Sequence, residues 1–362
     1  MAWEVKKLSE VCEKGSSNIS INKIDNDNGK YPIYGAKGLI KKVSFFHQDK
    51  EYISIIKDGA GIGRIEFREP FSSVIGTLQY INPKPTINIK YLYYFLLGID
   101  FSKYSQGAAI PHIYFKDYSK EELVLPPLPE QKRIVAILDK AFEKITQAKE
   151  NAEKNLNNAT EIIESYLQSV FENKGEGWEE KMLGEVCEEL FAGGDVPKDN
   201  SSKFKTDNFV IPIFSNGEKN KGLYGYTNVA RVTKPSITIS ARGTIGYSEI
   251  REEAFYPAIR LIVVTPKTNV LDLSYLKYVI SGIDFTHSGS SIPQLTVPMI
   301  KEYQISFPPL KAQRNIVQKL DTLSSETKKL EAVYQQKLTY LEELKKSILQ
   351  KAFNGELIEV SA

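Results

Sequence analysis

Two long stretches of the sequence place apolar residues with the period of an α-helix. Residues 130–171 contain neither proline nor glycine, and the same holds for residues 310–354, after which Gly355 acts as a stop signal. Apolar or small residues recur in both stretches at alternating steps of four and three, which is the heptad pattern of a coiled coil. At about 1.5 Å per residue, each predicted helix is roughly 60 Å long.

The length of the two predicted helices indicates that their apolar stripes pack against each other. A domain of about 120 residues has a radius near 15 Å, so a helix packed only on its own domain would overrun it. We therefore expect a coiled coil within the chain rather than two separate amphipathic helices, with Asn155, Thr327 and Lys337 as polar interruptions. The predicted interface consists of Ile134, Leu138, Ala141, Ile145, Ala148, Ala152, Ala159, Ile162, Tyr166, Ile316, Leu320, Leu323, Leu330, Tyr334, Leu341, Leu344 and Ile348.

The segments outside the long helices mix strand and helix signals. Short β-branched runs at residues 51–56 and 236–240 lead into glycine turns, as strands do. The Tyr- and Leu-rich runs at residues 89–97 and 273–280 have helical spacing, and we interpret their apolar side chains as core. Both halves of the chain are therefore predicted to be mixed α/β domains.

The sequence also repeats itself in order. The eleven-residue segments that begin at Trp3 and at Trp178 share eight identical positions. Six further matches follow at offsets near 175–184, among them a glycine turn that ends in Ile-Gly (59–63 and 243–246), Gly-Ile-Asp-Phe, an Ile-Pro loop and Pro-Pro-Leu-x-x-Gln-x-x-Ile-Val. Turns, helix starts and apolar anchors agree between the halves, whereas the segments between them differ. The chain is a tandem duplication, written domain, helix, domain, helix.

The duplication predicts a topology. If the second helix returns to the start of the first domain, the two helices are antiparallel, the molecule has a pseudo-two-fold axis and the chain ends lie close together. The predicted parts are a first domain (1–129), a first helix (130–172), a second domain (173–309), and a second helix with a tail (310–362).

Composition narrows the class of protein. Two cysteines are too few for a disulfide framework, and neither a membrane-length apolar run nor a signal peptide is present, so we expect a cytoplasmic protein. The net charge is only +2, but residues 200–247 carry +5 and residues 37–64 carry +3, while residues 130–172 carry −2. This local excess is compatible with a nucleic-acid partner or with ordinary solvated surface.

Motifs for catalysis are incomplete. The sequence contains no GxGxxG fingerprint, no P-loop and no Asn-Pro-Pro-aromatic or Asp-Pro-Pro-aromatic motif. Its three histidines differ in context, which argues against a metal site or a catalytic triad. We therefore expect no catalytic residue, no metal and no cofactor in this chain.

The loops after the strands hold the candidate binding residues. A glycine turn allows close approach to a phosphate, or is simply a tight turn, and the sequence leaves both open. Arg and Lys suit guanine edges, while Asn and Gln suit adenine. The residues expected to reach DNA are Lys37, Lys41, Lys42, Lys57, Arg64, Gln106, His112, Asn216, Lys219, Lys221, Tyr224, Arg242, Thr244 and Gln294.

The order of these motifs resembles that of the specificity subunits of type I restriction–modification enzymes. The resemblance covers essentially the whole chain, and the Pro-Pro-Leu-x-x-Gln-x-x-Ile-Val motif, which starts at Pro126 and again at Pro308, is its most specific part. Where the first copy has Pro129-Glu130, the second departs slightly with Lys311-Ala312.

The resemblance implies a function. Each domain would be a target-recognition domain for one half of a bipartite, asymmetric DNA site, and the helices would set the gap. Partners would be two methyltransferase subunits, which use S-adenosylmethionine to methylate adenine N6, and restriction subunits that use ATP and Mg²⁺. A recognition subunit of a type IIB-like enzyme and a coiled-coil scaffold without a DNA role remain the alternatives.

Overall fold

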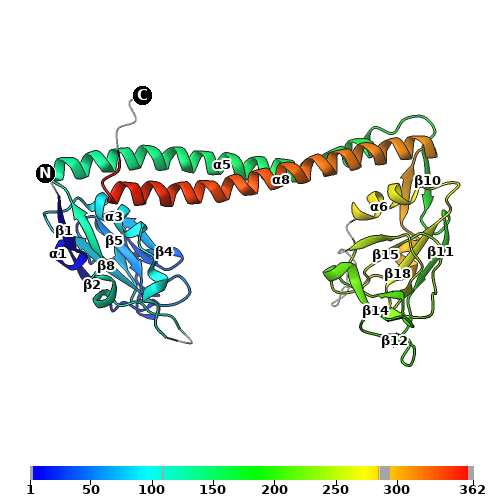
Figure 1. Ribbon diagram of the computed structural model, residues 1–362, viewed down its shortest axis with the longest axis horizontal. Coiled ribbons are helices and arrows are strands. Elements are labelled where there is room, and N and C mark those ends of the chain that lie inside the picture. The colour runs from blue at the N-terminus through cyan, green and yellow to red at the C-terminus, as the bar shows by residue number, and fades with distance from the viewer. Residues whose placement is uncertain (1–2, 108–109, 284, 286–293, 358–362) are drawn as a thin grey trace. The chain divides into compact units, whose positions relative to one another are not determined.

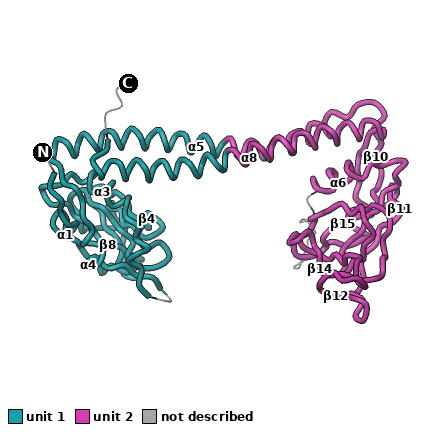
Figure 2. The backbone as a smooth tube through the Cα atoms, in the orientation of Figure 1, with its two compact units in different colours: residues 1–154, 334–362 teal, residues 155–333 magenta. Residues whose placement is uncertain are grey.

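The computed structural model describes residues 3–107, 110–283, 285 and 294–357, and it consists of two compact units. Unit 1 comprises residues 1–154 and 334–362, and unit 2 comprises residues 155–333 (Figure 2). Each unit thus contains one mixed α/β domain and part of each long helix. Among the described residues, no helix combines the length and the hydrophobicity that a membrane span requires.

Unit 1 begins with a domain of short strands and helices. Its elements are β1 (Glu4–Lys7), α1 (Leu8–Val11), β2 (Cys12–Ser16), α2 (Ile21–Ile24), β3 (Tyr31–Gly35), β4 (Gly38–Val43), β5 (Tyr52–Ile56), β6 (Ile65–Arg68), β7 (Ser73–Val74), β8 (Leu78–Pro83), α3 (Ile89–Leu97), η1 (Phe101–Tyr104), α4 (Phe115–Tyr118) and β9 (Glu122–Leu125).

Three sheets organise this domain. The largest has the strand order β2-β8-β5-β6 and is antiparallel throughout, β4-β3-β7 forms a second sheet, and β1 pairs with β9. Asn88 caps the start of helix α3, because its side-chain oxygen accepts hydrogen bonds from the backbone N–H groups of Lys90 and Tyr91. The apolar residues of α3 pack on the largest sheet and on the start of the first long helix, which makes the main core of the unit.

Unit 2 repeats this arrangement. Its elements are β10 (Glu179–Met182), β11 (Cys187–Ala192), β12 (Ser201–Ser202), β13 (Ile211–Phe214), η2 (Lys219–Gly222), β14 (Leu223–Thr227), β15 (Ser236–Ile239), β16 (Ser248–Arg251), β17 (Tyr256–Pro257), β18 (Ile262–Pro266), α6 (Leu273–Ser281), α7 (Val297–Lys301) and β19 (Gln304–Phe307).

The sheets of unit 2 have the same connectivity as those of unit 1. The order β11-β18-β15-β16 matches β2-β8-β5-β6, and β10 pairs with β19 as β1 pairs with β9. The remaining sheet, β12-β14-β13-β17, contains one strand more than its counterpart. Two similar mixed α/β domains, as predicted from the internal repeat, are therefore confirmed.

The two long helices are continuous. Helix α5 covers Leu128–Glu172 and helix α8 covers Leu310–Phe353. In unit 1 the helices lie side by side and antiparallel (Figure 1): the Lys345 ammonium lies 5.4 Å from the Phe142 ring centre, and Lys149 Nζ lies 2.8 Å from Glu342 Oε1. From Phe142 to Lys149 the numbering of α5 rises, whereas that of their partners in α8 falls from Lys345 to Glu342, so the helices run in opposite directions. The predicted helical pair is present in this unit.

The same pairing is found in unit 2. There the ammonium of Lys319 lies 4.7 Å from the Tyr166 ring centre. Along both helices the buried positions of the predicted interface are Ile134, Leu138, Ala152, Ala159 and Leu320. The half-buried ones are Ala141, Ile145, Ala148, Tyr166, Ile316, Leu323, Tyr334, Leu341 and Ile348.

The prediction of a buried interface position is wrong for three residues. Ile162, Leu330 and Leu344 are 39%, 41% and 47% exposed. An α-helix turns once per 3.6 residues, so a stripe followed through polar interruptions drifts to neighbouring positions. The neighbouring residues Ile163, Glu331 and Lys345 are half-buried, and the Lys345 ammonium lies over the Phe142 ring of α5. Thr327, which the pattern treated as an interruption, is buried at 3% exposure.

The end of each long helix packs into a domain core. In unit 1 the Phe353 ring lies 5.0 Å from that of Tyr91 and 5.4 Å from that of Phe95. In unit 2 the equivalent Phe171 lies 6.0 Å from Trp178. A Cβ atom built on Gly355 would come within 3.6 Å of Trp3, so both ends of the described chain meet in unit 1, as predicted.

The glycine that ends each repeated Ile-Gly turn packs against the repeated Gly-Ile-Asp-Phe motif. Gly63 and Gly246 have φ values of +78° and +84°. A Cβ atom on Gly63 would lie 2.2 Å from Cβ of Phe101, and one on Gly246 would lie 2.9 Å from the Phe285 ring. Both phenylalanines belong to the repeated Gly-Ile-Asp-Phe motif. The two motifs therefore recur together because they pack on one another, which favours a tight turn over a phosphate site.

Replacing Gly63 with alanine should destabilise the protein. The new methyl group would meet the Phe101 side chain, and the positive φ would add strain, together costing about 2–3 kcal/mol or more. Gly59→Ala is the matched control, because Gly59 also has a positive φ, +95°, but a Cβ there meets nothing within 4 Å. Chemical unfolding should show a larger loss for Gly63→Ala, and equal losses would contradict this account.

Candidate nucleic-acid interface

A buried glutamine ties each long helix to its domain. In unit 1 the Gln131 amide nitrogen donates to the carbonyls of Thr86, 3.1 Å away, and of Pro126, 2.8 Å away. Its oxygen accepts from the backbone N–H of Asn88, which caps α3, at 2.7 Å. All three hydrogen bonds are shielded from water, because Gln131 is 0% exposed.

Unit 2 contains the same clamp. Gln313 donates to the carbonyls of Val270 and Pro308 at 2.9 and 2.8 Å and accepts from the N–H of Asp272 at 2.8 Å. The glutamine of the repeated Pro-Pro-Leu-x-x-Gln motif is therefore structural, because it fixes the start of each long helix to the cap of the neighbouring short helix.

A tyrosine–aspartate pair reinforces this joint. Tyr94 donates to Asp139 at 2.5 Å in unit 1, and Tyr278 donates to Asp321 at 2.6 Å in unit 2. Burial and the neighbouring carboxylate raise the pKa of both phenols, so they remain donors at neutral pH. The loops of each domain are thus carried on a scaffold that is locked to the long helices.

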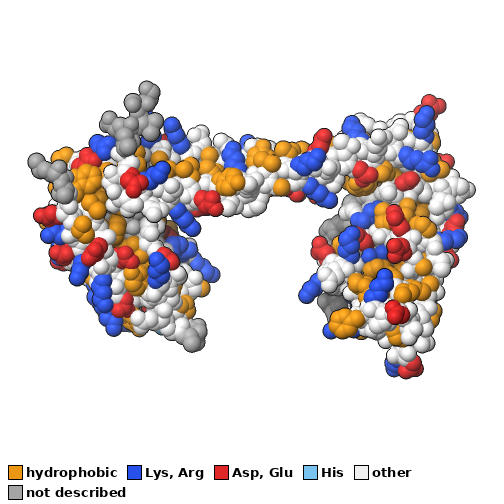
Figure 3. Space-filling view, in the orientation of Figure 1, with side chains coloured by type: hydrophobic (Ala, Val, Ile, Leu, Met, Phe, Trp, Pro, Cys, Tyr) orange, Lys and Arg blue, Asp and Glu red, His pale blue; other side chains and the backbone are white. Residues whose placement is uncertain are grey.

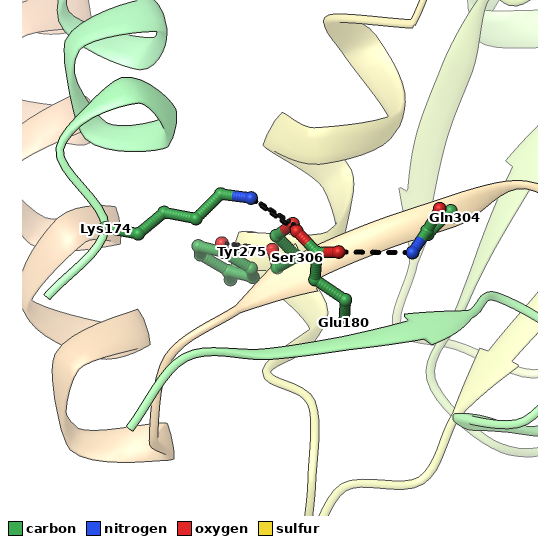
Figure 4. Close-up of polar contacts among 5 residues, drawn as sticks. All are labelled: Lys174, Glu180, Tyr275, Gln304 and Ser306. Carbon is green, nitrogen blue, oxygen red and sulfur yellow. Dashed lines mark hydrogen bonds and ion pairs between the residues drawn. The ribbon is translucent and has the colours of Figure 1, made fainter. Parts of the chain in front are cut away.

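The chain enters unit 2 through a further polar network (Figure 4). Lys174 Nζ lies 2.6 Å from Glu180 Oε1 and 3.0 Å from the Ser306 hydroxyl, while Gln304 donates to the other Glu180 oxygen at 3.2 Å. Tyr275 donates to the Ser306 carbonyl at 2.9 Å. The network joins the β10–β19 pair to α6 and so stabilises the scaffold.

Two loops meet beyond the end of β5 in unit 1. The backbone N–H of Gly59 donates to the Pro111 carbonyl, and that of Ile113 donates to the Lys57 carbonyl, both at 2.9 Å. The side chains of Asp58 and His112 meet as well, with Oδ1 and Nδ1 2.8 Å apart. The predicted residues Lys57 and His112 are thus brought together around Asp58, which the sequence reasoning missed.

The other predicted residues of these loops lie close by in the chain. Gln106 exchanges backbone hydrogen bonds with His112 at 2.8 and 2.7 Å, and its side chain donates to Asp117 at 3.1 Å. Arg64 is half-exposed and lies 3.7 Å from Glu66. Lys57 Nζ lies 3.5 Å from Asp58 Oδ2. The cluster therefore mixes donors and acceptors and is not simply basic.

The equivalent loops meet in unit 2. The N–H of Leu295 donates to the Ala241 carbonyl at 3.0 Å, and Arg242 Nη2 donates to Gln294 Oε1 at 3.1 Å. Thr244 is exposed in the same turn. The Gly289–Pro293 part of the second loop lies outside the described residues. Two predicted residues, Arg242 and Gln294, are therefore in direct contact.

Some predicted residues of the first hairpin serve the fold. Lys37, in the β3–β4 turn, and Lys42, on β4, are exposed as expected. Lys41 instead donates to the carbonyls of Ile24 and Asp25 at 3.0 and 2.8 Å and so closes the end of α2. Its assignment as a DNA contact is not supported, because its ammonium already satisfies two backbone acceptors.

The predicted residues of the second hairpin also fall into an exposed group and a group that holds the fold. Lys219 and Tyr224 are exposed, and Lys221 pairs with Glu249 at 2.5 Å. Asn216, by contrast, donates to the Ile259 carbonyl at 2.5 Å and accepts from the Ala241 N–H at 2.7 Å. Both ends of its amide are occupied inside the domain, so it holds the loop and has little capacity left for a base.

A buried arginine was missed in each domain. Arg68 stacks 3.9 Å from the Tyr34 ring centre and donates to Ser54 at 3.0 Å. Arg251 stacks 3.6 Å from that of Phe214 and donates to Thr238 at 3.1 Å, and burial lowers its pKa. The recurrence of an arginine at the end of both β6 and β16 was the available signal. These cations join the two main sheets of each domain.

The surface charge, the two cysteines and the possible metal ligands are the features that bear on catalysis. Figure 3 shows lysine and arginine side chains interspersed with acidic ones over the face in view of each unit. Burial raises the pKa of the Cys12 and Cys187 thiols to about 12, so both are protonated at neutral pH. In the described parts of both units, no three His, Cys, Asp or Glu residues are placed to bind a metal ion.

Comparison with known proteins gives a consistent result. A family model described as the type I restriction modification DNA specificity domain matches residues 2–156 and again 175–340. Two proteins of Mycoplasma pneumoniae named as type I specificity subunits are similar to this chain. One is 29% identical, covering 88% of each chain, and the other is 34% identical, covering 80% of this chain and 88% of the relative.

Solved structures show the same fold. A chain from a study of complex assembly and conformational transition of the type I R-M system has a TM-score of 0.79 at 18% identity, covering 98% of each chain. The HsdS subunit from Thermoanaerobacter tengcongensis has a TM-score of 0.61 at 18% identity, covering 98% of this chain and 97% of that one. The chain therefore belongs to the family of type I restriction–modification DNA specificity subunits, which confirms the prediction of a non-catalytic specificity subunit.

Proposed function

We propose that this chain reads a bipartite DNA site, with one half read by the domain at 1–129 and the other by the domain at 173–309. The observation that carries this proposal is the loop pair that both domains build on one scaffold with different side chains, Asp58 with His112 and Arg242 with Gln294. One scaffold with two sets of exposed groups suits two different half-sites.

The long helices α5 and α8 would fix the distance between the half-sites. A continuous helix is stiff over its length, and each helix is clamped to a domain by a buried glutamine. Two readers on one rigid spacer gain affinity through effective concentration, and they tolerate only one gap because DNA also turns with a period of about 10 base pairs.

Methyltransferase subunits would dock on the helices. On α8, Tyr340 and Leu344 are 57% and 47% exposed in unit 1, and Leu330 and Val333 are 41% and 58% exposed in unit 2. Apolar side chains exposed at helical spacing favour packing against helices of a partner. Two methyltransferase subunits would bind S-adenosylmethionine and restriction subunits would bind ATP and Mg²⁺, so this chain would need no cofactor of its own. The complex would work in the cytoplasm.

The predicted DNA contacts fall into two groups under this proposal. Exposed cations such as Lys37, Lys42 and Lys219 suit phosphates, which fix position without reading sequence. Residues of the joined loops suit base edges, because their side chains are held in place. Lys41 and Asn216 act within the fold.

Methylation sequencing tests the proposal. A host that lacks other modification systems would express this chain with its methyltransferase subunit, and a split adenine motif modified on both strands is expected. A continuous motif, or no modification from a complex that assembles, would contradict it. The DNA affinity of the complex should also fall steeply between low and physiological salt, because phosphate contacts release counterions.

A further inference from the structure

We propose that one side-chain pair in each domain determines one base of its half-site, and that the two pairs read opposite hydrogen-bonding patterns. The pairs are Asp58 with His112 in unit 1 and Arg242 with Gln294 in unit 2. This inference rests on the proposed function, since it assigns bases within the half-sites that the two domains would read.

The two pairs occupy the same place in their domains. In unit 1 the N–H of Ile113 donates to the Lys57 carbonyl, and in unit 2 the N–H of Leu295 donates to the Ala241 carbonyl, at 2.9 and 3.0 Å. The paired side chains belong to the residues immediately after the acceptors and immediately before the donors. One backbone hydrogen bond thus fixes the same position for two chemically different pairs.

The pair in unit 2 offers donors. Gln294 Oε1 accepts from Arg242 Nη2 at 3.1 Å, which uses one of the two lone pairs of the amide oxygen. The Gln294 NH₂ group and the other guanidinium N–H groups of Arg242 can only donate hydrogen bonds. Guanine presents two acceptors, O6 and N7, on its major-groove edge, and arginine is well matched to them. Unit 2 therefore selects guanine at this position.

The pair in unit 1 offers acceptors. His112 Nδ1 lies 2.8 Å from Asp58 Oδ1, and a carboxylate accepts only, so Nδ1 carries a proton. A histidine ring with one proton, on Nδ1, presents a lone pair at Nε2. Asp58 Oδ2 adds a second acceptor, 3.5 Å from the Lys57 ammonium. An exocyclic amino group, N6 of adenine or N4 of cytosine, satisfies such acceptors. Unit 1 therefore selects an amino-bearing base edge.

These pairs are better suited to read a base than the exposed lysines around them. A side chain fixed by a hydrogen bond loses less conformational entropy on binding than a free one. Asp58 and His112 are 28% and 38% exposed, so they are held on two backbone-paired loops and still reach solvent. Lys42, by comparison, is an exposed strand side chain.

Exchange of the pairs tests the inference. The double variant Asp58→Arg with His112→Gln would give unit 1 the pair of unit 2, and Arg242→Asp with Gln294→His would do the reverse. Each complex with the methyltransferase subunit would be analysed by methylation sequencing. Each exchange should change one base of one half-site, towards guanine in the first variant and away from guanine in the second, and leave the other half unchanged.

Single substitutions test the same inference if exchanging a side-chain pair prevents assembly of the complex. Arg242→Ala should relax one position, lowering discrimination against the wrong base on the order of 10- to 100-fold. Lys42→Gln is the control and should weaken methylation of all sites evenly. If Arg242→Ala or His112→Ala also lowers methylation evenly with the motif unchanged, these residues contact phosphates and the inference is wrong. A continuous wild-type motif would instead overturn the proposed function itself.

Discussion

A variant with one extra heptad in each long helix should lose methylation of the original motif and modify a motif with a longer gap. The insertions belong after Lys149 in α5 and before Glu342 in α8, because these residues pair across the helices at 2.8 Å and mark one level of the coiled coil. A heptad adds about 10 Å at 1.5 Å per residue, which corresponds to roughly three base pairs at about 3.4 Å each. Methylation sequencing of the variant complex measures the new gap.

The control for this experiment is a heptad inserted in α5 alone. Such a variant shifts the inner face of one helix against the other, so it should lose the helical pairing and the activity. Both half-site sequences should be unchanged in the double insertion, since the loops are untouched. An unchanged gap in an active double-insertion variant would show that the helices do not set the distance.

Replacing Gln131 with leucine should destabilise unit 1 by about 3 kcal/mol or more. The change removes three hydrogen bonds and leaves the Thr86 and Pro126 carbonyls and the Asn88 N–H buried without that partner, at about 1–3 kcal/mol each. Urea unfolding followed by circular dichroism measures the loss. Gln313→Leu should produce a loss of similar size in unit 2, because its clamp has the same three bonds.

Gln147→Leu is the matched control for the clamp. Gln147 is an exposed glutamine on the same helix, so its replacement should change stability by less than about 0.5 kcal/mol. If Gln131→Leu were as mild as this control, the repeated Pro-Pro-Leu-x-x-Gln motif would have to be explained by something other than the joint between helix and domain.

The sequence was most informative where a pattern is repeated. The internal duplication predicted two similar domains, because similar sequences fold alike, and the strand order β11-β18-β15-β16 matches β2-β8-β5-β6. The heptad pattern predicted two long helices for the same reason. Its register failed at Ile162, Leu330 and Leu344, since burial depends on how the helix turns relative to its partner and a polar interruption hides that drift.

The candidate site was harder to predict. The sequence pointed to Arg242 beside a glycine turn and to Gln294 after a recurring loop. Only the folded chain shows that the two side chains are in contact, at 3.1 Å. Asp58 was overlooked because an acidic residue does not suggest DNA binding until its histidine partner is known. Lys41 and Asn216 were chosen for their polar character, and tertiary hydrogen bonds use that character inside the domain.

The most direct test of two readers at a fixed separation is a gap series. Duplexes that carry both half-sites, with gaps lengthened by one base pair at a time, would compete for the complex of this chain with its methyltransferase subunit. We expect one gap to bind at least about 10-fold more tightly than gaps one or two base pairs longer or shorter, because each base pair also rotates one half-site by roughly a tenth of a turn. Equal affinity across the series would contradict the account.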